Sequence, residues 1–138
     1  ASAKRMDLLS ENPKLGHITT FGGHPVIASA CLATLKEITE TNLMLEALEK
    51  EKLFRSLLVH PLIEEIRGKG LMLAAMTKSD HITNEVILKC QDKGLILFWL
   101  LFEGTAIRIT PPLTISNEEI QEGCKIILEV MDEIYNRE

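Results

Sequence analysis

The feature that most constrains the fold is an apolar helix-forming run, PVIASACLATL, at residues 25–35. Every position in this run is apolar or small, and a helix that is apolar all round must be buried on all sides. Nothing else in the 138 residues supplies that much cover. We therefore expect part of the burial to come from another domain or from a partner subunit.

The loop directly before this run, GHITTFGGHP at residues 16–25, is a candidate anion site. Small residues let backbone N–H groups approach a phosphate, and the helix that follows directs the positive end of its dipole to the same place. A glycine pair before a helix is also typical of a simple tight turn. Both interpretations stay open on the residues alone.

Charge and hydropathy exclude several classes of function. The chain has 15 basic and 20 acidic residues, with a formal charge of −5 and no basic cluster, which argues against nucleic-acid binding. The longest apolar run, residues 95–102, is far shorter than the roughly 18 residues of a membrane span. The first residues also lack the apolar core of a signal peptide. We therefore expect neither a membrane nor a nucleic-acid partner.

The three cysteines, Cys31, Cys90 and Cys124, are widely spaced and lie in apolar helical patterns. An odd number at such spacing predicts buried free thiols in a reducing cytoplasm. It does not indicate a disulfide or metal framework. We therefore expect a cytoplasmic protein.

Residues 42–138 alternate helical and strand patterns. Helices are predicted after Thr41-Asn42, from about Ile82, and after a capping box formed by Ser116 and Glu119. Gly94 is placed to end the second of these helices. The inward positions are expected to be Met44, Ala47, Leu48, Phe54 and Leu58, then Ile82, Val86, Ile87 and Cys90, and finally Ile120, Cys124, Ile127, Met131 and Ile134. The charged residues Glu46, Glu49, Lys50 and Glu51 are expected to face away from the first stripe.

Three strands are predicted between these helices. Residues 66–77 combine a turn-prone RGKG with a continuous apolar run, residues 95–102 form a second apolar run, and residues 106–110 alternate in polarity. Gly104 is expected to separate the last two strands, and Pro111-Pro112 to end the pairing. The sequence thus predicts an α+β fold, with a small sheet of about three strands and helices on one face, preceded by a long linker helix.

Arg108 is the residue in this part of the chain that most clearly suggests a chemical role. Strand alternation places it opposite Ile107 and Ile109, beside a rigid diproline bend. A planar guanidinium held on a stiff element suits bidentate capture of a carboxylate. The alternative is an exposed strand arginine that pairs with a nearby acid such as Glu103.

Other catalytic patterns are missing from the sequence. The serines lack a GxSxG context, and the histidines show no metal-ligand spacing: His17, His24, His60 and His81. His24 is expected to cap the helix that starts at Pro25. Neither nucleophilic hydrolysis nor a metal site is indicated.

Taken in order, three segments resemble the C-terminal part of class III aminotransferases, the pyridoxal-phosphate enzymes that include acetylornithine, ornithine and 4-aminobutyrate aminotransferases. GHITTFGGHPVIASACLATL resembles the family's TFGGNP segment and the helix after it. IRGKGLMLAAM resembles its VRGKGLM strand, and AIRITPPLTISNEEI resembles its RxxPPLxIxxEEI ending. Three motifs in the right order are far more specific than any one of them.

The resemblance implies roles for two residues. Thr20 matches the threonine whose hydroxyl and backbone N–H bind the phosphate of pyridoxal 5'-phosphate in the neighbouring subunit of a homodimer. Arg108 matches the arginine that binds the substrate α-carboxylate. One departure is His24, which stands where the family has asparagine. No catalytic residue is carried over, because none of the lysines lies in a context that resembles the family's Schiff-base lysine.

We therefore expect residues 1–24 to be the end of a large cofactor domain, residues 25–41 an interdomain linker helix, and residues 42–138 a C-terminal small domain. The complete enzyme would move an amino group from an ω-amine or amino acid to a 2-oxo acid, and this chain alone would be inactive. The alternative is an independent α+β interaction or ligand-binding module without catalysis.

Overall fold

The structure is a computed structural model that describes residues 2–9 and 18–137. The chain divides into two compact units, Ala1–Thr41 and Asn42–Glu138. The first unit contains a short helix α1 (Ala3–Met6), a 3-10 turn η1 (Asp7–Leu9) and the long helix α2 (Pro25–Glu40). The start of the predicted anion loop at Gly16 lies outside the described residues.

Helix α2 begins where the sequence predicts. His24 is its N-cap, and the His24 Nδ1 accepts a hydrogen bond from the Val26 N–H at 3.3 Å. No residue of α2 is buried within the described structure, and Cys31 is exposed. The prediction of a buried thiol is therefore wrong for Cys31, because the described part of the chain provides no cover for this helix.

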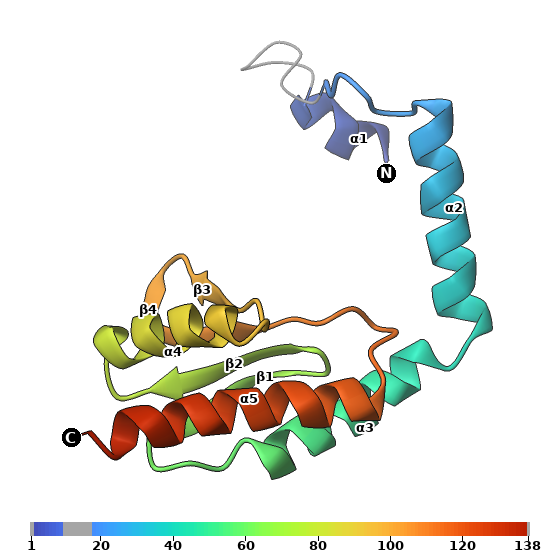
Figure 1. Ribbon diagram of the computed structural model, residues 1–138. Coiled ribbons are helices and arrows are strands. Elements are labelled where there is room, and N and C mark those ends of the chain that lie inside the picture. Colours follow the sequence, from blue (N-terminus) through green and yellow to red (C-terminus); the bar gives the residue numbers. More distant parts are fainter. Residues whose placement is uncertain (1, 10–17, 138) are drawn as a thin grey trace. The chain divides into compact units, whose positions relative to one another are not determined.

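The second unit is built on one antiparallel sheet of four strands, in the order β1-β2-β4-β3 (Figure 1). Its elements are α3 (Leu43–Leu57), β1 (Ile63–Lys69), β2 (Met72–Thr77), α4 (Asp80–Asp92), β3 (Phe98–Leu100), β4 (Glu103–Ile109) and α5 (Asn117–Tyr135). Because side chains alternate along a strand, Leu73, Ala75, Ile107 and Ile109 point to the same face of the sheet.

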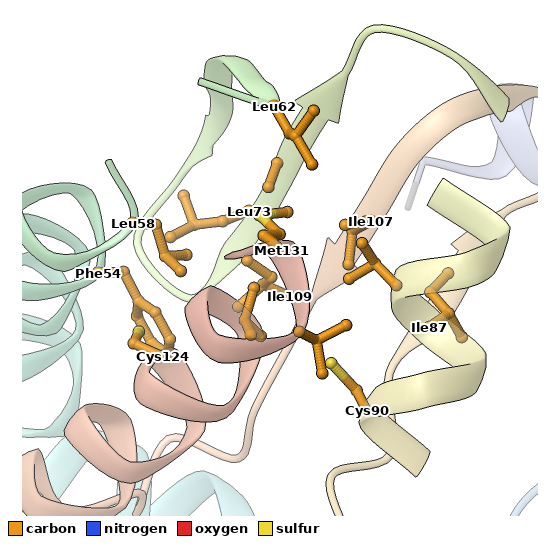
Figure 2. Packing of buried hydrophobic residues seen from close by; sticks show 14 of the residues in the cluster. Phe54, Leu58, Leu62, Leu73, Ile87, Cys90, Ile107, Ile109, Cys124 and Met131 are labelled. Carbon is orange, nitrogen blue, oxygen red and sulfur yellow. The ribbon is translucent and has the colours of Figure 1, made fainter. Parts of the chain in front are cut away.

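The three helices of this unit cover that face. Figure 2 shows side chains from α3, α4 and α5 meeting those of β2 and β4 in one apolar core. Val86, Cys90, Ile107, Val130 and Met131 have no measurable exposure. The predicted α+β class with helices on one face is confirmed, and the buried positions predicted for α4 and α5 are correct.

The strands differ from the prediction in number and extent. The turn expected at RGKG begins only at Gly70, so Arg67–Lys69 belong to β1, a fourth strand that the sequence analysis missed. Its sequence, IEEIRGK, is polar because an edge strand with one open face can expose its side chains to water. The strand expected at residues 95–102 is only Phe98–Leu100, and Gly104 lies inside β4 instead of separating two strands.

The inward stripe of α3 also differs. Met44 and Leu48 are exposed, whereas Lys50 is 8% exposed and therefore buried. The Lys50 ammonium donates a 2.8 Å hydrogen bond to the Leu113 carbonyl and pairs with Glu46 at 3.2 Å. These partners offset the cost of burying the charge, which the helical pattern alone could not reveal.

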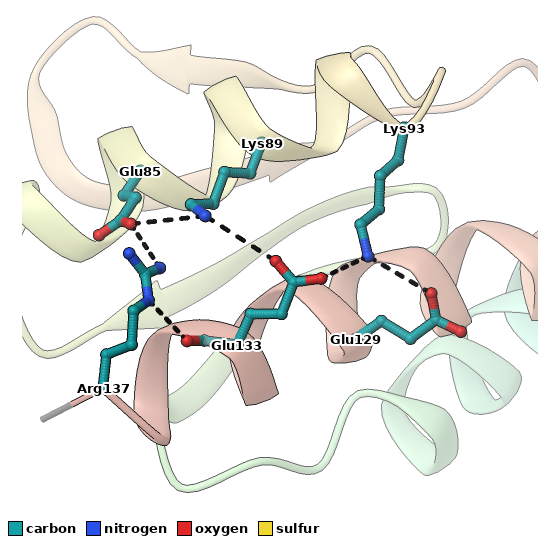
Figure 3. Close-up of polar contacts among 6 residues, drawn as sticks. All are labelled: Glu85, Lys89, Lys93, Glu129, Glu133 and Arg137. Atoms are coloured by element: carbon teal, nitrogen blue, oxygen red, sulfur yellow. Dashed lines mark hydrogen bonds and ion pairs between the residues drawn. The ribbon is translucent and has the colours of Figure 1, made fainter.

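Helices α4 and α5 end and begin at the predicted signals. Gly94 follows α4 with φ of 87°, a left-handed conformation that glycine adopts without strain. Ser116 and Glu119 form the predicted capping box at the start of α5, and these bonds lower the pKa of Glu119. Ion pairs then join the two helices through Lys89, Lys93 and Glu133 (Figure 3).

Among the described residues, no helix combines the length and the hydrophobicity that a membrane span requires. No group of three or more His, Cys, Asp or Glu side chains among them could hold a metal ion.

Candidate functional site

Arg108 lies near the end of β4, on the face of the sheet opposite the helices. Its neighbours Ile107 and Ile109 are buried in the core, as strand alternation predicts. In the sheet register Arg108 faces Ala74 of β2 on one side and Phe98 of β3 on the other. Because Ala74 has only a small side chain, the Arg108 guanidinium lies toward β3.

The Arg108 guanidinium lies over the Phe98 ring, with its carbon 5.0 Å from the ring centroid. This is a cation–π contact, which attracts the cation to the negative face of the ring. The Arg108 Nε is buried and makes no hydrogen bond to the rest of the described protein. A buried N–H without an acceptor is costly, and the described residues supply no acceptor for this one.

The alternative partner for Arg108, Glu103, is engaged elsewhere. The Glu103 carboxylate accepts hydrogen bonds from the hydroxyl and the backbone N–H of Thr105, which lower the pKa of Glu103. Its nearby cation is Arg67, which pairs with Glu65. Within the described structure no carboxylate forms an ion pair with Arg108, so the expectation of an Arg108–Glu103 pair is not met.

A cavity of about 360 Å³ lies beside Arg108. Its walls come from four places: the segment before β3, the end of β4 with the diproline bend, the first turns of α5, and Phe54 of α3. The lining is mostly apolar. Arg108 and Glu119 are the charged residues in the lining.

Thr20 lies in the first unit, in the turn that leads into α2. The turn is closed by two backbone hydrogen bonds, Gly22 N–H to the Thr19 carbonyl and His24 N–H to the Phe21 carbonyl. A Cβ at position 22 would meet the Thr19 hydroxyl, so a larger residue there would force the Thr19 side chain to turn away. Thr20 is exposed, and its hydroxyl makes no hydrogen bond to any other part of the chain that the structure describes.

The structure adds three residues that the sequence analysis did not place near Arg108. Phe98 was assigned to a strand, but its role depends on the register between β3 and β4, which no local pattern gives. Gly123 lines the cavity from inside α5, where a glycine in a helix interior was the one available signal. Lys50 anchors the segment after the diproline through the Leu113 carbonyl.

Comparison with known proteins points to one family. The sequence model described as "Aminotransferase class-III" matches residues 1–131. An acetylornithine aminotransferase from Caldanaerobacter subterraneus subsp. tengcongensis is 35% identical over 123 residues, which cover 86% of this chain and 30% of that protein. A leucine/methionine racemase from Thermococcus litoralis is also 35% identical, over 86% of this chain and 29% of its own length.

Solved structures agree with the sequence match. The ornithine aminotransferase from Toxoplasma gondii ME49 superposes with a TM-score of 0.79 at 28% identity, over 99% of this chain and 33% of that chain. The chain thus spans about a third of the length of its relatives, whose family uses pyridoxal 5'-phosphate. These matches confirm the resemblance drawn from the three motifs, and this chain belongs to the class III aminotransferases.

Proposed function

We propose that this chain is the C-terminal part of a pyridoxal-phosphate-dependent aminotransferase, which moves an amino group from an ω-amine or amino acid to a 2-oxo acid. Residues 42–138 serve as the small domain, residues 25–41 as the linker helix, and residues 1–24 as the end of the cofactor domain. Family membership and the coverage of about a third of the relatives' length support this assignment.

Arg108 binds the substrate carboxylate in this proposal. The observation that carries the assignment is the buried Arg108 Nε, which finds no acceptor in the described structure while the guanidinium lies over Phe98. The planar fork offers two parallel N–H groups to the two carboxylate oxygens. The contact fixes which end of the amino or oxo acid faces the small domain.

Thr20 binds the cofactor phosphate. The Thr19–Gly23 turn fits a phosphate because it presents a hydroxyl without another partner in the described structure, beside a glycine whose missing side chain keeps the backbone accessible. When bound, pyridoxal phosphate supplies an electron sink for the bonds at the amino carbon. In a homodimer, Thr20 would serve the phosphate site of the neighbouring subunit.

The free thiols of Cys90 and Cys124 fit an enzyme of the reducing cytoplasm. The lysine that reacts with the cofactor is assigned outside this chain. The chain alone, supplied with pyridoxal phosphate, acetylornithine or 4-aminobutyrate, and a 2-oxo acid, is therefore expected to form no new amino acid. Turnover measured by chromatography would overturn this part of the proposal.

The carboxylate site can be tested on the 138-residue chain itself. Titration with acetate at constant ionic strength is expected to shift the NMR signals of the Arg108 Nε–Hε group and of the Ala74 and Phe98 amides. Arg108→Lys should weaken the amide shifts, because a point charge replaces a bidentate fork. An independent module of the alternative kind would show no carboxylate dependence at these positions.

A further inference from the structure

The imidazole of His60 joins the connection between α3 and β1 to the last turns of α5. Its side chain is only 6% exposed, and both ring nitrogens have a partner. The Leu62 backbone N–H lies 3.1 Å from Nδ1, and Asp132 Oδ1 of α5 lies 3.2 Å from Nε2. The ring also meets the Tyr135 ring edge to face, with centroids 5.8 Å apart. His60 therefore bridges two segments that are 72 residues apart in the sequence.

The two partners of the ring fix where its proton lies. The Leu62 N–H can only donate, so Nδ1 is the acceptor and carries no proton. The Asp132 carboxylate accepts, so Nε2 carries the proton and donates it. Both contacts are satisfied together only by the neutral imidazole with its proton on Nε2.

A second proton on the ring would change the two contacts in opposite directions. It has to bind at Nδ1, where it would meet the Leu62 N–H, and two donors cannot share a hydrogen bond. The contact between Nε2 and Asp132 would become stronger, because an imidazolium and a carboxylate form a charge-assisted hydrogen bond. Protonation thus exchanges a contact inside the α3–β1 connection for a tighter contact with α5.

The other charged groups beside the ring lie in a recess that His60 shares with Arg55 of α3 and with Glu64 and Glu65 of β1. Arg55 is held by a carboxylate on its own helix and by two carbonyls of β1. Glu65 pairs with a neighbouring arginine of its strand. Among the charged side chains that the structure describes, Asp132 is the one that contacts the ring nitrogen.

We propose that His60 is a proton-controlled latch. In its neutral form the ring closes the α3–β1 connection on the Leu62 N–H, and in its charged form it releases Leu62 and holds only Asp132. The latch is independent of the proposed roles of Arg108 and Thr20. It gives the second unit a local conformational response to acidification, at the place where the chain enters the edge strand of the sheet.

NMR of the 138-residue chain tests the latch between pH 8 and pH 5, the range in which histidine ordinarily changes its charge. At pH 8, long-range ¹H–¹⁵N correlations of the His60 ring should show a proton on Nε2 and none on Nδ1. The hydrogen-exchange protection factor of the Leu62 amide should fall about two- to twelvefold as the ring takes up its second proton, the change expected for the loss of one hydrogen bond. The Ile63 amide donates to the His60 backbone carbonyl at 2.9 Å, so it is the internal control and should keep its protection factor.

Two variants separate the arms of the latch. The side-chain oxygen of His60→Asn can accept the Leu62 N–H across the same two-residue spacing but does not titrate, so Leu62 should be equally protected at pH 8 and pH 5. Asp132→Asn keeps an acceptor for Nε2 but removes the negative charge that favours the imidazolium, so the release of Leu62 should require a lower pH than in the wild type. Glu122→Gln, at an exposed position of α5, is the matched control and should leave the release unchanged.

Four results would overturn the latch. A proton on Nδ1 at pH 8 would leave the Leu62 N–H without an acceptor on the ring. Constant protection of Leu62 while His60 titrates would show that the contact does not respond to the proton. A loss of protection in His60→Asn as large as in the wild type would assign the response to another group. Equal losses at Leu62 and Ile63 would show that the whole turn opens for another reason.

Discussion

The guanidinium of Arg108 lies over the ring of Phe98, 5.0 Å from its centroid, and the two residues are direct partners in the register of β3 and β4. The short strand β3 therefore supports the arginine as well as closing the edge of the sheet. Because the Arg108 Nε has no acceptor elsewhere in the described chain, the Phe98 ring is the contact that holds the guanidinium in place.

Phe98→Leu is expected to weaken carboxylate binding by Arg108. A cation–π contact at a partly exposed site contributes about 0.5–1 kcal/mol, so the acetate dissociation constant should rise about two- to fivefold. Phe98→Tyr keeps an aromatic face and should bind acetate as the wild type does. If the leucine and tyrosine variants bind equally, the ring does not position Arg108.

Lys50→Met should destabilise the second unit by about 1–2 kcal/mol. The change keeps most of the buried stem but leaves the Leu113 carbonyl without its charged donor, a bond of the stronger kind. Urea unfolding followed by circular dichroism measures the loss. Part of this loss is offset, because Lys50→Met also removes the cost of burying a charged group.

Lys52 on the same helix is the matched control for Lys50. Its ammonium pairs with Glu49 at 2.8 Å, but both side chains are 72% exposed, so water screens the pair. Lys52→Met should therefore change the free energy of unfolding by less than about 0.5 kcal/mol. Similar losses in the two variants would show that the Leu113 contact adds nothing to stability.

The three thiols should differ sharply in reactivity. Burial raises the pKa of Cys90 to about 11 and that of Cys124 to about 12, so both stay protonated and shielded at pH 8. Cys31 is exposed. Mass spectrometry after brief iodoacetamide treatment at pH 8 should find one modified thiol in the native chain and three in guanidinium. Native modification of Cys90 or Cys124 would contradict the packing of α4 or α5.

How much of the fold could be predicted from the sequence depends on whether each signal lies within one short segment. Helix α5 was predictable in full, because its capping box and its apolar spacing both lie within one segment. Strand β1 was missed because edge strands tolerate polar residues, so IEEIRGK does not resemble a strand by hydropathy. The burial of Lys50 depends on a carbonyl 63 residues away.

The candidate site also combines features that a local pattern predicts with features that depend on tertiary packing. Strand alternation correctly placed Arg108 on the face opposite Ile107 and Ile109, since that pattern has a period of two residues. The support from Phe98 depends on the pairing of two strands, and the cavity depends on how α5 packs against the segment before β3. These are tertiary relationships, which no single window of the sequence contains.

Glu133→Gln should reduce the loss of stability on acidification. The Glu133 carboxylate accepts a 2.7 Å hydrogen bond from Lys93, which lowers its pKa below the ordinary 4.5, and Lys89 approaches it at 3.8 Å (Figure 3). A depressed pKa stabilises the folded chain above the unfolded value, and this contribution is lost as the pH falls below about 4.5. Unfolding free energies at pH 6.5 and pH 3.5 should therefore differ less in Glu133→Gln than in the wild type.

Glu122→Gln, an exposed change elsewhere on α5, is the control and should keep the wild-type difference. An unchanged difference in Glu133→Gln would mean that the bridge between α4 and α5 contributes nothing to acid stability.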